Sequence, residues 1–165
     1  MKSVIAAALG LTAASSLQAQ TTATSNARAP TAISPAVDLS TATPIDGNWS
    51  YSAQPGGSEA TFVNAAGQPQ LAITCTRGVR QVTISKPPTV IAPFILVWTS
   101  ALTRNLPSSY NPATRRLSAT VSAYDPILDA MGFSRGRIGF SALNQPALIV
   151  PAWGEVSRVV EDCRA

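Results

Sequence analysis

The sequence of 165 residues contains no histidine, only two cysteines and few charged residues, which make up 12% of the chain. Histidine is the commonest general base and a leading metal ligand in proteins. Its absence excludes a histidine-dependent catalytic triad, and a zinc site would need unusual ligands with only two cysteines present. We therefore expect no catalytic residues, no metal site and no cofactor, and we expect a protein that is not an enzyme.

A strong charge of either sign is also missing, because the formal net charge is only +4 at pH 7. Domains that bind nucleic acid usually carry a clustered basic face. Here the arginines are scattered along the chain, and Lys2 and Lys86 are the only lysines. The composition therefore predicts no nucleic-acid partner.

The chain has no hydrophobic run of the roughly 20 residues that a membrane-spanning helix needs. Its first residues, MKSVIAAALGLTAASSLQAQ, instead combine the positive charge of Lys2 with a short apolar stretch and a small residue, Ala19. This is the pattern of a secretory signal peptide over residues 1–19, and the compact alanine-rich leader is typical of bacteria. We expect cleavage near Ala19 and a periplasmic or secreted mature chain without a transmembrane segment.

The two cysteines, Cys75 and Cys163, fit an exported chain, because disulfides form and persist in oxidising compartments. Two cysteines allow only one intramolecular pairing. In the chain-entropy model, closing a loop of about 88 residues would stabilise the fold by about 4–5 kcal/mol. The alternative is two separate thiols.

The composition changes near residue 46. Residues 20–45 are rich in Thr, Ala, Ser and Pro and show no helical or strand period, which predicts a flexible tether. Part of this segment, around residues 37–39, could alternatively lie as an irregular edge on the domain. From residue 46 to residue 165 the pattern predicts a single β-rich domain.

Short runs of alternating apolar and polar residues, separated by turn signals, dominate residues 46–165 and predict an antiparallel β domain. Eight segments are predicted to be strands: 48–53, 59–65, 70–75, 80–86, 94–100, 116–123, 136–142 and 146–152. Among them, residues 94–100 are apolar on both faces, which indicates a central strand covered on both sides. Residues 101–115 contain Pro107 and Pro112 and are interpreted as a loop. We expect a mainly β fold, an antiparallel β-sandwich or partly open barrel of about eight strands.

Two helices are expected in addition. Asp125 is a good helix cap and Pro126 suits the first helical position, so a short internal helix should begin there and stop at Gly132. The last residues, GEVSRVVEDCRA, place three valines and Cys163 on one face of a C-terminal helix. Cys75 points inward on its own strand, so a Cys75–Cys163 bridge would fasten this helix to the sheet.

The segment Gly132–Gly136, GFSRG, matches the G-x-S-x-G signature of a nucleophile elbow in serine hydrolases. That elbow requires a strand before the serine and a helix after it. Here the expected order is reversed, and Ser134 has no histidine to act as its base. We interpret the two glycines as the end of a helix and the entry to a strand.

Two pairs of arginines are candidates for an anion site, since the guanidinium fork suits carboxylate and phosphate. They are Arg115 with Arg116 and Arg135 with Arg137. If the pairs converge on one concave surface, they could bind small anions or acidic glycans. The alternative is that they are surface arginines, some of them paired with acidic side chains.

The segments LVWTSALTRNLP, NPATRRLSATVSAYDPILDAMGFSRGRI and LIVPAWGEVSRVVEDCR together resemble a group of small exported proteins of sphingomonad-type alphaproteobacteria. The similarity covers roughly residues 48–165 and includes the two cysteines. The group has no assigned activity, so the resemblance implies no catalytic residues.

The expected function is that of a periplasmic or envelope protein that acts as a non-enzymatic binding or accessory module, with another envelope protein as a candidate partner. A binder of small anions or acidic glycans through the arginine pairs is the first alternative. A hydrolase with a histidine-free mechanism is the second.

Overall fold

The computed structural model describes residues 38, 40–87, 91–143 and 145–165. Every helix and strand falls in one compact unit, Pro35–Ala165. The expected signal peptide, its cleavage point at Ala19 and most of the expected tether lie outside the described residues.

The larger of two antiparallel sheets has six strands, in the order β1-β2-β3-β4-β8-β7. Its first four strands, β1 (Gly47–Gln54), β2 (Gly57–Asn64), β3 (Pro69–Thr76) and β4 (Gln81–Lys86), follow one another as a meander, as the alternation predicts. Strands β8 (Arg116–Ser122) and β7 (Ser109–Asn111) complete it. Gly56 at the β1–β2 turn has φ of +87°, a conformation that favours glycine.

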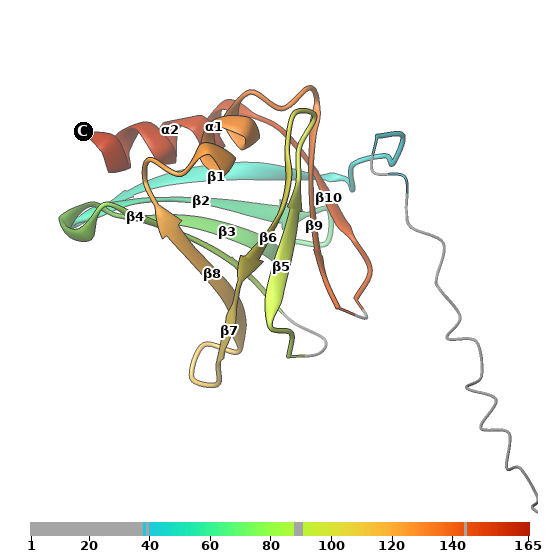
Figure 1. The fold of residues 1–165 in the computed structure, drawn as a ribbon, viewed down its shortest axis with the longest axis horizontal. Coiled ribbons are helices and arrows are strands. Elements are labelled where there is room, and N and C mark those ends of the chain that lie inside the picture. Colours follow the sequence, from blue (N-terminus) through green and yellow to red (C-terminus); the bar gives the residue numbers. More distant parts are fainter. Residues whose placement is uncertain (1–37, 39, 88–90, 144) are drawn as a thin grey trace, which may run out of the picture. The chain divides into compact units, whose positions relative to one another are not determined.

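The second sheet has four strands in the order β10-β9-β5-β6. These are β5 (Phe94–Trp98), β6 (Thr103–Pro107), β9 (Arg137–Ala142) and β10 (Leu148–Pro151). The chain passes from the second sheet to the first where β6 is followed directly by β7 (Figure 1). The two sheets are not closed into a barrel, so the mainly β, partly open architecture predicted from the sequence is confirmed.

The core lies between the sheets and follows the period of two along each strand. In β3 and β4, the inward positions Leu71, Ile73, Val82 and Ile84 are fully buried. Burial of one such side chain contributes about 1.5–3 kcal/mol. The largest fully buried side chains come from both sheets and from α1 and are Phe62, Phe140, Leu71, Ile73, Ile84, Ile95, Leu106, Leu117, Ile127, Leu128, Met131 and Ile138.

The prediction of a loop over residues 101–115 is wrong, because this segment contains the strands β6 and β7. The prolines end these strands rather than preventing them: Pro107 is the last residue of β6, and Pro112 follows β7. Leu106 is fully buried and Tyr110 packs against the core, so both strands carry an inward face. The described residues therefore form ten strands rather than about eight.

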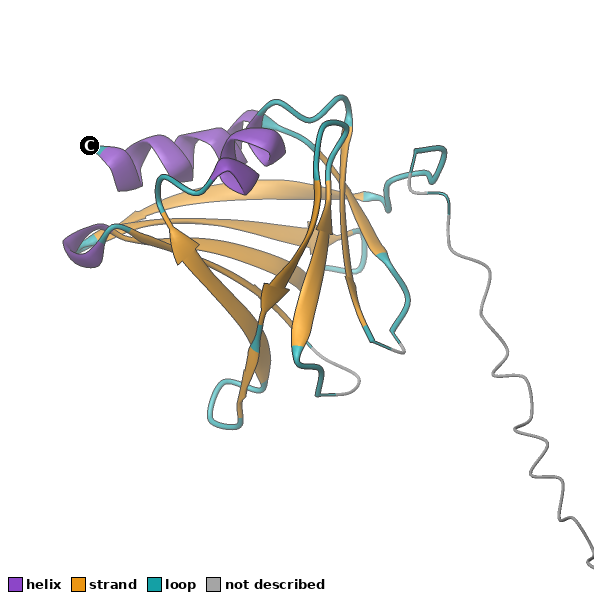
Figure 2. Cartoon of the chain, in the orientation of Figure 1, coloured by secondary structure: helices purple, strands orange, loops and turns teal. Residues whose placement is uncertain are grey.

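Both predicted helices are present, α1 (Pro126–Gly132) and α2 (Gly154–Arg164), together with a short 3-10 turn, η1 (Arg77–Val79). Asp125 caps α1 as predicted, since its side chain accepts a hydrogen bond of 3.0 Å from the backbone N–H of Ile127. The helices lie together at one end of the sheets (Figure 2). The buried face of α2 consists of Val156, Val159, Val160 and Cys163, as its periodicity predicts.

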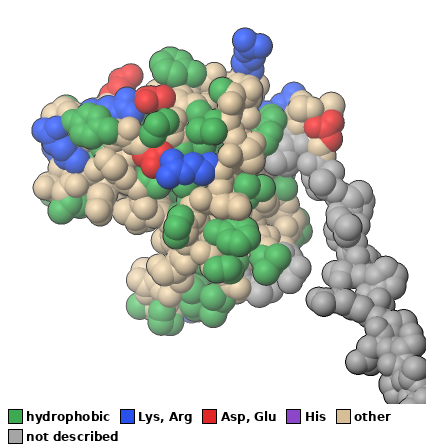
Figure 3. Space-filling model, viewed as in Figure 1, with side chains coloured by type: hydrophobic (Ala, Val, Ile, Leu, Met, Phe, Trp, Pro, Cys, Tyr) green, Lys and Arg blue, Asp and Glu red, His purple; other side chains and the backbone are tan. Residues whose placement is uncertain are grey.

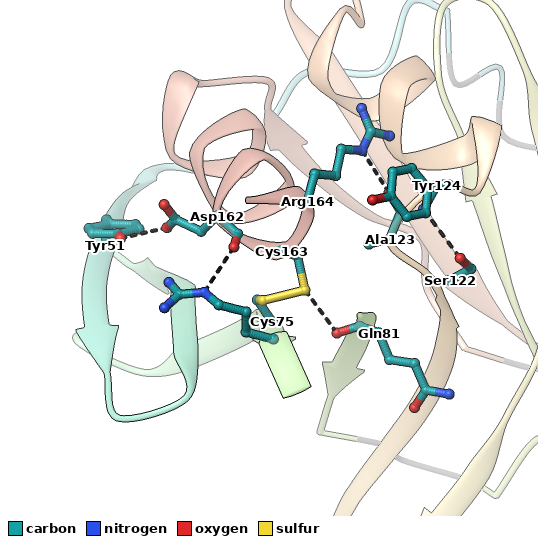
Figure 4. The surroundings of a disulfide bond; sticks show 10 residues. Tyr51, Cys75, Gln81, Ser122, Ala123, Tyr124, Asp162, Cys163 and Arg164 are labelled. Carbon is teal, nitrogen blue, oxygen red and sulfur yellow. Dashed lines mark hydrogen bonds between the residues drawn. A yellow bond between two sulfur atoms is a disulfide. The ribbon is translucent and has the colours of Figure 1, made fainter. Parts of the chain in front are cut away.

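A disulfide joins Cys75 on β3 to Cys163 on α2, with 5.4 Å between the two Cα atoms (Figure 4). Both cysteines are buried. Around the bridge, the Tyr51 hydroxyl donates to the Asp162 carboxylate and Arg77 donates to the Asp162 carbonyl oxygen. The bridge and these polar contacts hold α2 against β1 and β3, as the shared inward direction of the two cysteines predicts.

The described end of the expected tether, residues 40–45, contacts the domain. The N–H of Ile45 donates to the carbonyl oxygen of Ile149 over 2.9 Å. Arg137 donates to the carbonyl oxygen of Ala42 over 2.6 Å. This end of the segment therefore lies along β9 and β10.

Candidate functional site

The two arginine pairs lie at opposite ends of the sheets. Arg115 is in the turn between β7 and β8, and Arg116 is the first residue of β8. Strand β8 then runs toward α1, whereas β9, which begins at Arg137, starts just after α1 and runs away from it (Figure 1). The structure does not bring the four arginines onto one concave surface, so they do not form a joint anion site.

Two of these arginines have structural partners. Arg116 donates from Nε to the Ser85 hydroxyl and from Nη2 to the Ser85 carbonyl oxygen, each over 2.9 Å. Arg137 holds the segment before β1 through its bond to Ala42. Arg115 and Arg135 are exposed.

Ser134 is buried, with 8% of its surface exposed, and its hydroxyl is fully engaged. It donates over 2.5 Å to the carbonyl oxygen of Arg137 and accepts over 3.0 Å from the N–H of Ser100. It follows α1 and precedes β9, which is the reverse of the order in a nucleophile elbow. Ser134 therefore ties the β5–β6 turn to the entry of β9.

Two acidic side chains near the helices, Asp125 and Asp129, are paired with arginines. Arg104 contacts Asp125 at 2.5 Å and Arg164 contacts Asp129 at 2.7 Å, the two ion pairs among the described residues. On the face seen in Figure 3, charged side chains of both signs gather around the helices. The arginines in these two ion pairs are not those of the candidate pairs, so the alternative that some of the four candidate arginines have acidic partners is not confirmed.

A pocket of about 250 Å³ opens at the other end of the fold, where the end of β4 faces the β9–β10 connection. Its lining includes Lys86 and the side-chain amides of Gln70 and Gln145. The remaining lining residues are apolar: Ile45, Pro87, Pro146, Ala147 and Leu148. An apolar wall with a few converging polar groups is the usual composition of a small-molecule site.

Lys86 is the unusual residue of this pocket, because only 6% of its surface is exposed. Its Nζ donates a hydrogen bond of 3.2 Å to Oε1 of Gln145, a neutral acceptor. Neither ion pair among the described residues involves Lys86. Burial lowers the pKa of the Lys86 ammonium below its ordinary value of 10.5. A buried cation normally has an anionic partner, because desolvation of an unpaired charge is costly.

Sequence reasoning did not select Lys86 as a binding residue, although the signal was present. Val82, Ile84 and Lys86 occupy alternate positions of β4, so all three point inward. A lysine that continues an apolar inward series must either leave the core at the strand end or lie in a cavity. The position of Gln145 could not be predicted, because it depends on how the second sheet sits over the first.

Other kinds of site are not built by the part of the chain that the structure describes. These residues contain no cluster of three or more cysteine or acidic side chains arranged to hold a metal ion. Among the same residues, no helix is long and apolar enough to span a bilayer.

Comparisons with protein-family models, with curated proteins and with solved structures found no match to this chain. Its function is therefore inferred from its own residues.

Proposed function

We propose that this chain is an exported, periplasmic or secreted, non-enzymatic binding module whose pocket at Lys86 holds a small anionic ligand. The observation that carries the proposal is the buried Lys86 ammonium, which faces a pocket and has a neutral hydrogen-bond partner. An anion in the pocket would supply the missing countercharge. A charge-assisted hydrogen bond in a site of low dielectric is stronger than one made in water.

The lining narrows the class of ligand. One cation and two amides provide polar contacts, and five apolar residues form the rest of the wall. Pockets for drug-sized ligands usually measure about 300–1,000 Å³, so a pocket of about 250 Å³ suits a smaller molecule. A monocarboxylate with a short aliphatic or aromatic body satisfies the cation and the apolar wall together.

The ligand can be tested directly at Lys86, because it is the only lysine after Lys2. Protein labelled with ¹⁵N-lysine is titrated with hexanoate and benzoate, and with hexanol and hexylamine as uncharged and cationic counterparts. The Nζ signal, identified by its loss in Lys86→Met, should shift and saturate with the carboxylates alone. Equal shifts with hexanol, or none with any compound, would contradict a carboxylate site.

A matched pair of variants separates a local countercharge from general charge attraction. Lys86→Met removes the buried cation, and Arg115→Gln removes one exposed cation outside the pocket. Calorimetric titration should show that Lys86→Met loses carboxylate binding while Arg115→Gln retains it. Equal losses would indicate attraction by net charge rather than binding in the pocket.

Export is supported by the leader sequence and by the Cys75–Cys163 bridge, which an oxidising compartment would preserve. Fractionation of cells that express the full chain should place it outside the cytoplasm, with a new N-terminus at Gln20. Recovery from the cytosol with Met1 retained and two reactive thiols would contradict export.

A further inference from the structure

The face of the six-stranded sheet that points away from the core carries mainly hydroxyl side chains. The strand registers align these residues into two rows that run across the strands. The first row is Ser50, Thr61, Ala72, Ser85, Ser118 and Ser109, and the second is Ser52, Glu59, Thr74, Thr83 and Thr120. Glu59 is therefore the one charged side chain in the two rows.

A depression of about 360 Å³ lies on this outer face, lined by Glu59, Thr61, Pro69, Ala72, Ser85 and Arg116. Its two charged side chains have opposite signs. Glu59 comes from β2 and Arg116 from β8, with β3 and β4 between them. The depression thus has an acidic side and a basic side over a floor of small residues.

The Glu59 carboxylate is held in place by two hydroxyls. Thr61 donates to Oε1 over 3.0 Å, and Thr74 donates to Oε2 over 2.9 Å. A carboxylate can accept about four hydrogen bonds. Each oxygen can therefore still accept a bond from a ligand without movement of the side chain.

The Arg116 guanidinium is fixed in a similar way. Two of its nitrogens bond to Ser85, while Nη1 makes no hydrogen bond to any described residue. Burial lowers the pKa of Arg116 from its ordinary value, and the charge of Glu59 partly opposes this change. Nη1 thus keeps both of its N–H donors for a ligand.

Glu59 and Arg116 belong to neither of the two ion pairs formed by described residues. Each is oriented by hydroxyl or carbonyl groups rather than by the other. We propose that this depression binds a short zwitterionic peptide, with its ammonium group at Glu59 and its carboxylate at Arg116. The opposite charges of the ligand then match the two sides of the site.

The contacts of the two side chains set the length of the ligand. Glu59 is bonded to Thr74 on β3, and Arg116 is bonded to Ser85 on the adjacent strand β4. Because Ala72 is the register partner of Ser85, Thr74 and Ser85 are diagonal neighbours, which lie about 7–8 Å apart. An extended peptide spans about 3.3–3.6 Å per residue, so a di- or tripeptide of about 7–10 Å suits this spacing.

Calorimetric titration of the unmodified protein with glycine, diglycine, triglycine and pentaglycine tests both charge and length. Diglycine or triglycine should bind best. N-acetylation or C-terminal amidation of triglycine should each weaken binding at least about tenfold, because each removes a charge-assisted hydrogen bond. Equal binding of capped and free peptides, no binding of any peptide, or preferential binding of an uncharged oligosaccharide would overturn the proposal.

Variants then locate the site. Glu59→Gln and Arg116→Met should each weaken triglycine binding at least about tenfold. Arg115→Gln, in the adjacent turn, and Glu161→Gln, exposed on α2, remove the same kinds of charge outside the depression and should leave binding unchanged. Lys86→Met should also bind triglycine normally, so this proposal can fail or succeed independently of the carboxylate pocket.

Discussion

The phenolic oxygen of Tyr51 donates a hydrogen bond of 2.6 Å to Oδ2 of Asp162, and this bond ties β1 to α2 across 111 residues. Arg158 lies over the Tyr51 ring, with 3.8 Å between its Cζ and the ring centroid. Arg77 also donates to the carbonyl oxygen of Asp162. The helix is therefore attached to the sheet by polar contacts as well as by the disulfide.

This contact predicts an acid-sensitive attachment of α2. The hydrogen bond from Tyr51 lowers the pKa of Asp162 below its ordinary value of 3.8. A lowered carboxyl pKa contributes stability above pH 3.8, and this contribution is lost as the pH falls through the folded-state pKa. Chemical denaturation between pH 7 and pH 2 should show that the free energy of unfolding falls in this acid range, and that it falls by less in Tyr51→Phe. Tyr110→Phe is the matched control, and an equal effect of both variants would contradict this role of Tyr51.

Removal of the disulfide should destabilise the fold strongly. The bridge closes a loop with a sequence separation of 88 residues, which corresponds to about 4.6 kcal/mol in the chain-entropy model. Cys75→Ala with Cys163→Ala should lower the free energy of unfolding by several kcal/mol and speed amide exchange in α2. A reductant should destabilise the unmodified protein and leave the double variant unchanged. Unchanged stability on reduction would show that the bridge contributes little.

Ser134→Ala tests the structural role of this serine. The substitution removes the partner of the Arg137 carbonyl oxygen and of the Ser100 N–H, and both of these contacts are partly buried. An unsatisfied buried polar group costs about 1–3 kcal/mol, so the midpoint of denaturation should fall. Ser100→Ala, which removes the hydroxyl that accepts from the N–H of Arg135, is a nearby exposed control and should cost less. A Ser134→Ala protein as stable as the unmodified one would contradict the role.

Lys86→Met should stabilise the ligand-free protein. Replacement of a buried ion pair by apolar side chains of similar volume is often neutral or stabilising by about 1–4 kcal/mol, and Lys86 belongs to neither ion pair among the described residues, so its removal leaves no such partner behind. Burial lowers the pKa of Lys86 in the folded protein below its ordinary value of 10.5. Between these two pKa values the unfolded chain binds more protons at Lys86 than the folded protein does. The free energy of unfolding of the unmodified protein therefore rises as the pH rises through this window. The difference in the free energy of unfolding between Lys86→Met and the unmodified protein should therefore become smaller in alkaline solution, as measured by chemical denaturation.

Lys86→Met also tests the premise of the carboxylate pocket, which is that the Lys86 ammonium has no anionic partner in this chain. If Lys86 were held by an anionic group of this chain, its removal would leave that group uncompensated and destabilise the fold by about 3–5 kcal/mol. Lys86→Gln removes the charge but keeps a polar side chain. In denaturation experiments its free energy of unfolding should lie between those of the unmodified protein and Lys86→Met. A loss of stability in both variants would show that the lysine is a structural partner rather than a ligand-binding group.

Local patterns along the chain were sufficient to predict the mainly β class, the two helices and the inward direction of both cysteines. These features depend on local periods of two and 3.6 residues, which are visible along the chain. The cap at Asp125 was equally local. Only β6 and β7 were missed, because Pro107 and Pro112 were interpreted as signs of a loop although they lie at the end of one strand and just beyond the other.

The polar side chains that come together could not be predicted, because their contacts depend on the packing of the whole fold. Whether Arg116 and Arg137 converge depends on the directions of β8 and β9. The presence of Glu59 and Arg116 in one depression depends on the placement of the two strands between them. The pocket at Lys86 likewise needs Gln145 from the connection between β9 and β10. Local periodicity gives the face on which a side chain lies, but strand order and sheet packing are non-local and determine what lies opposite it.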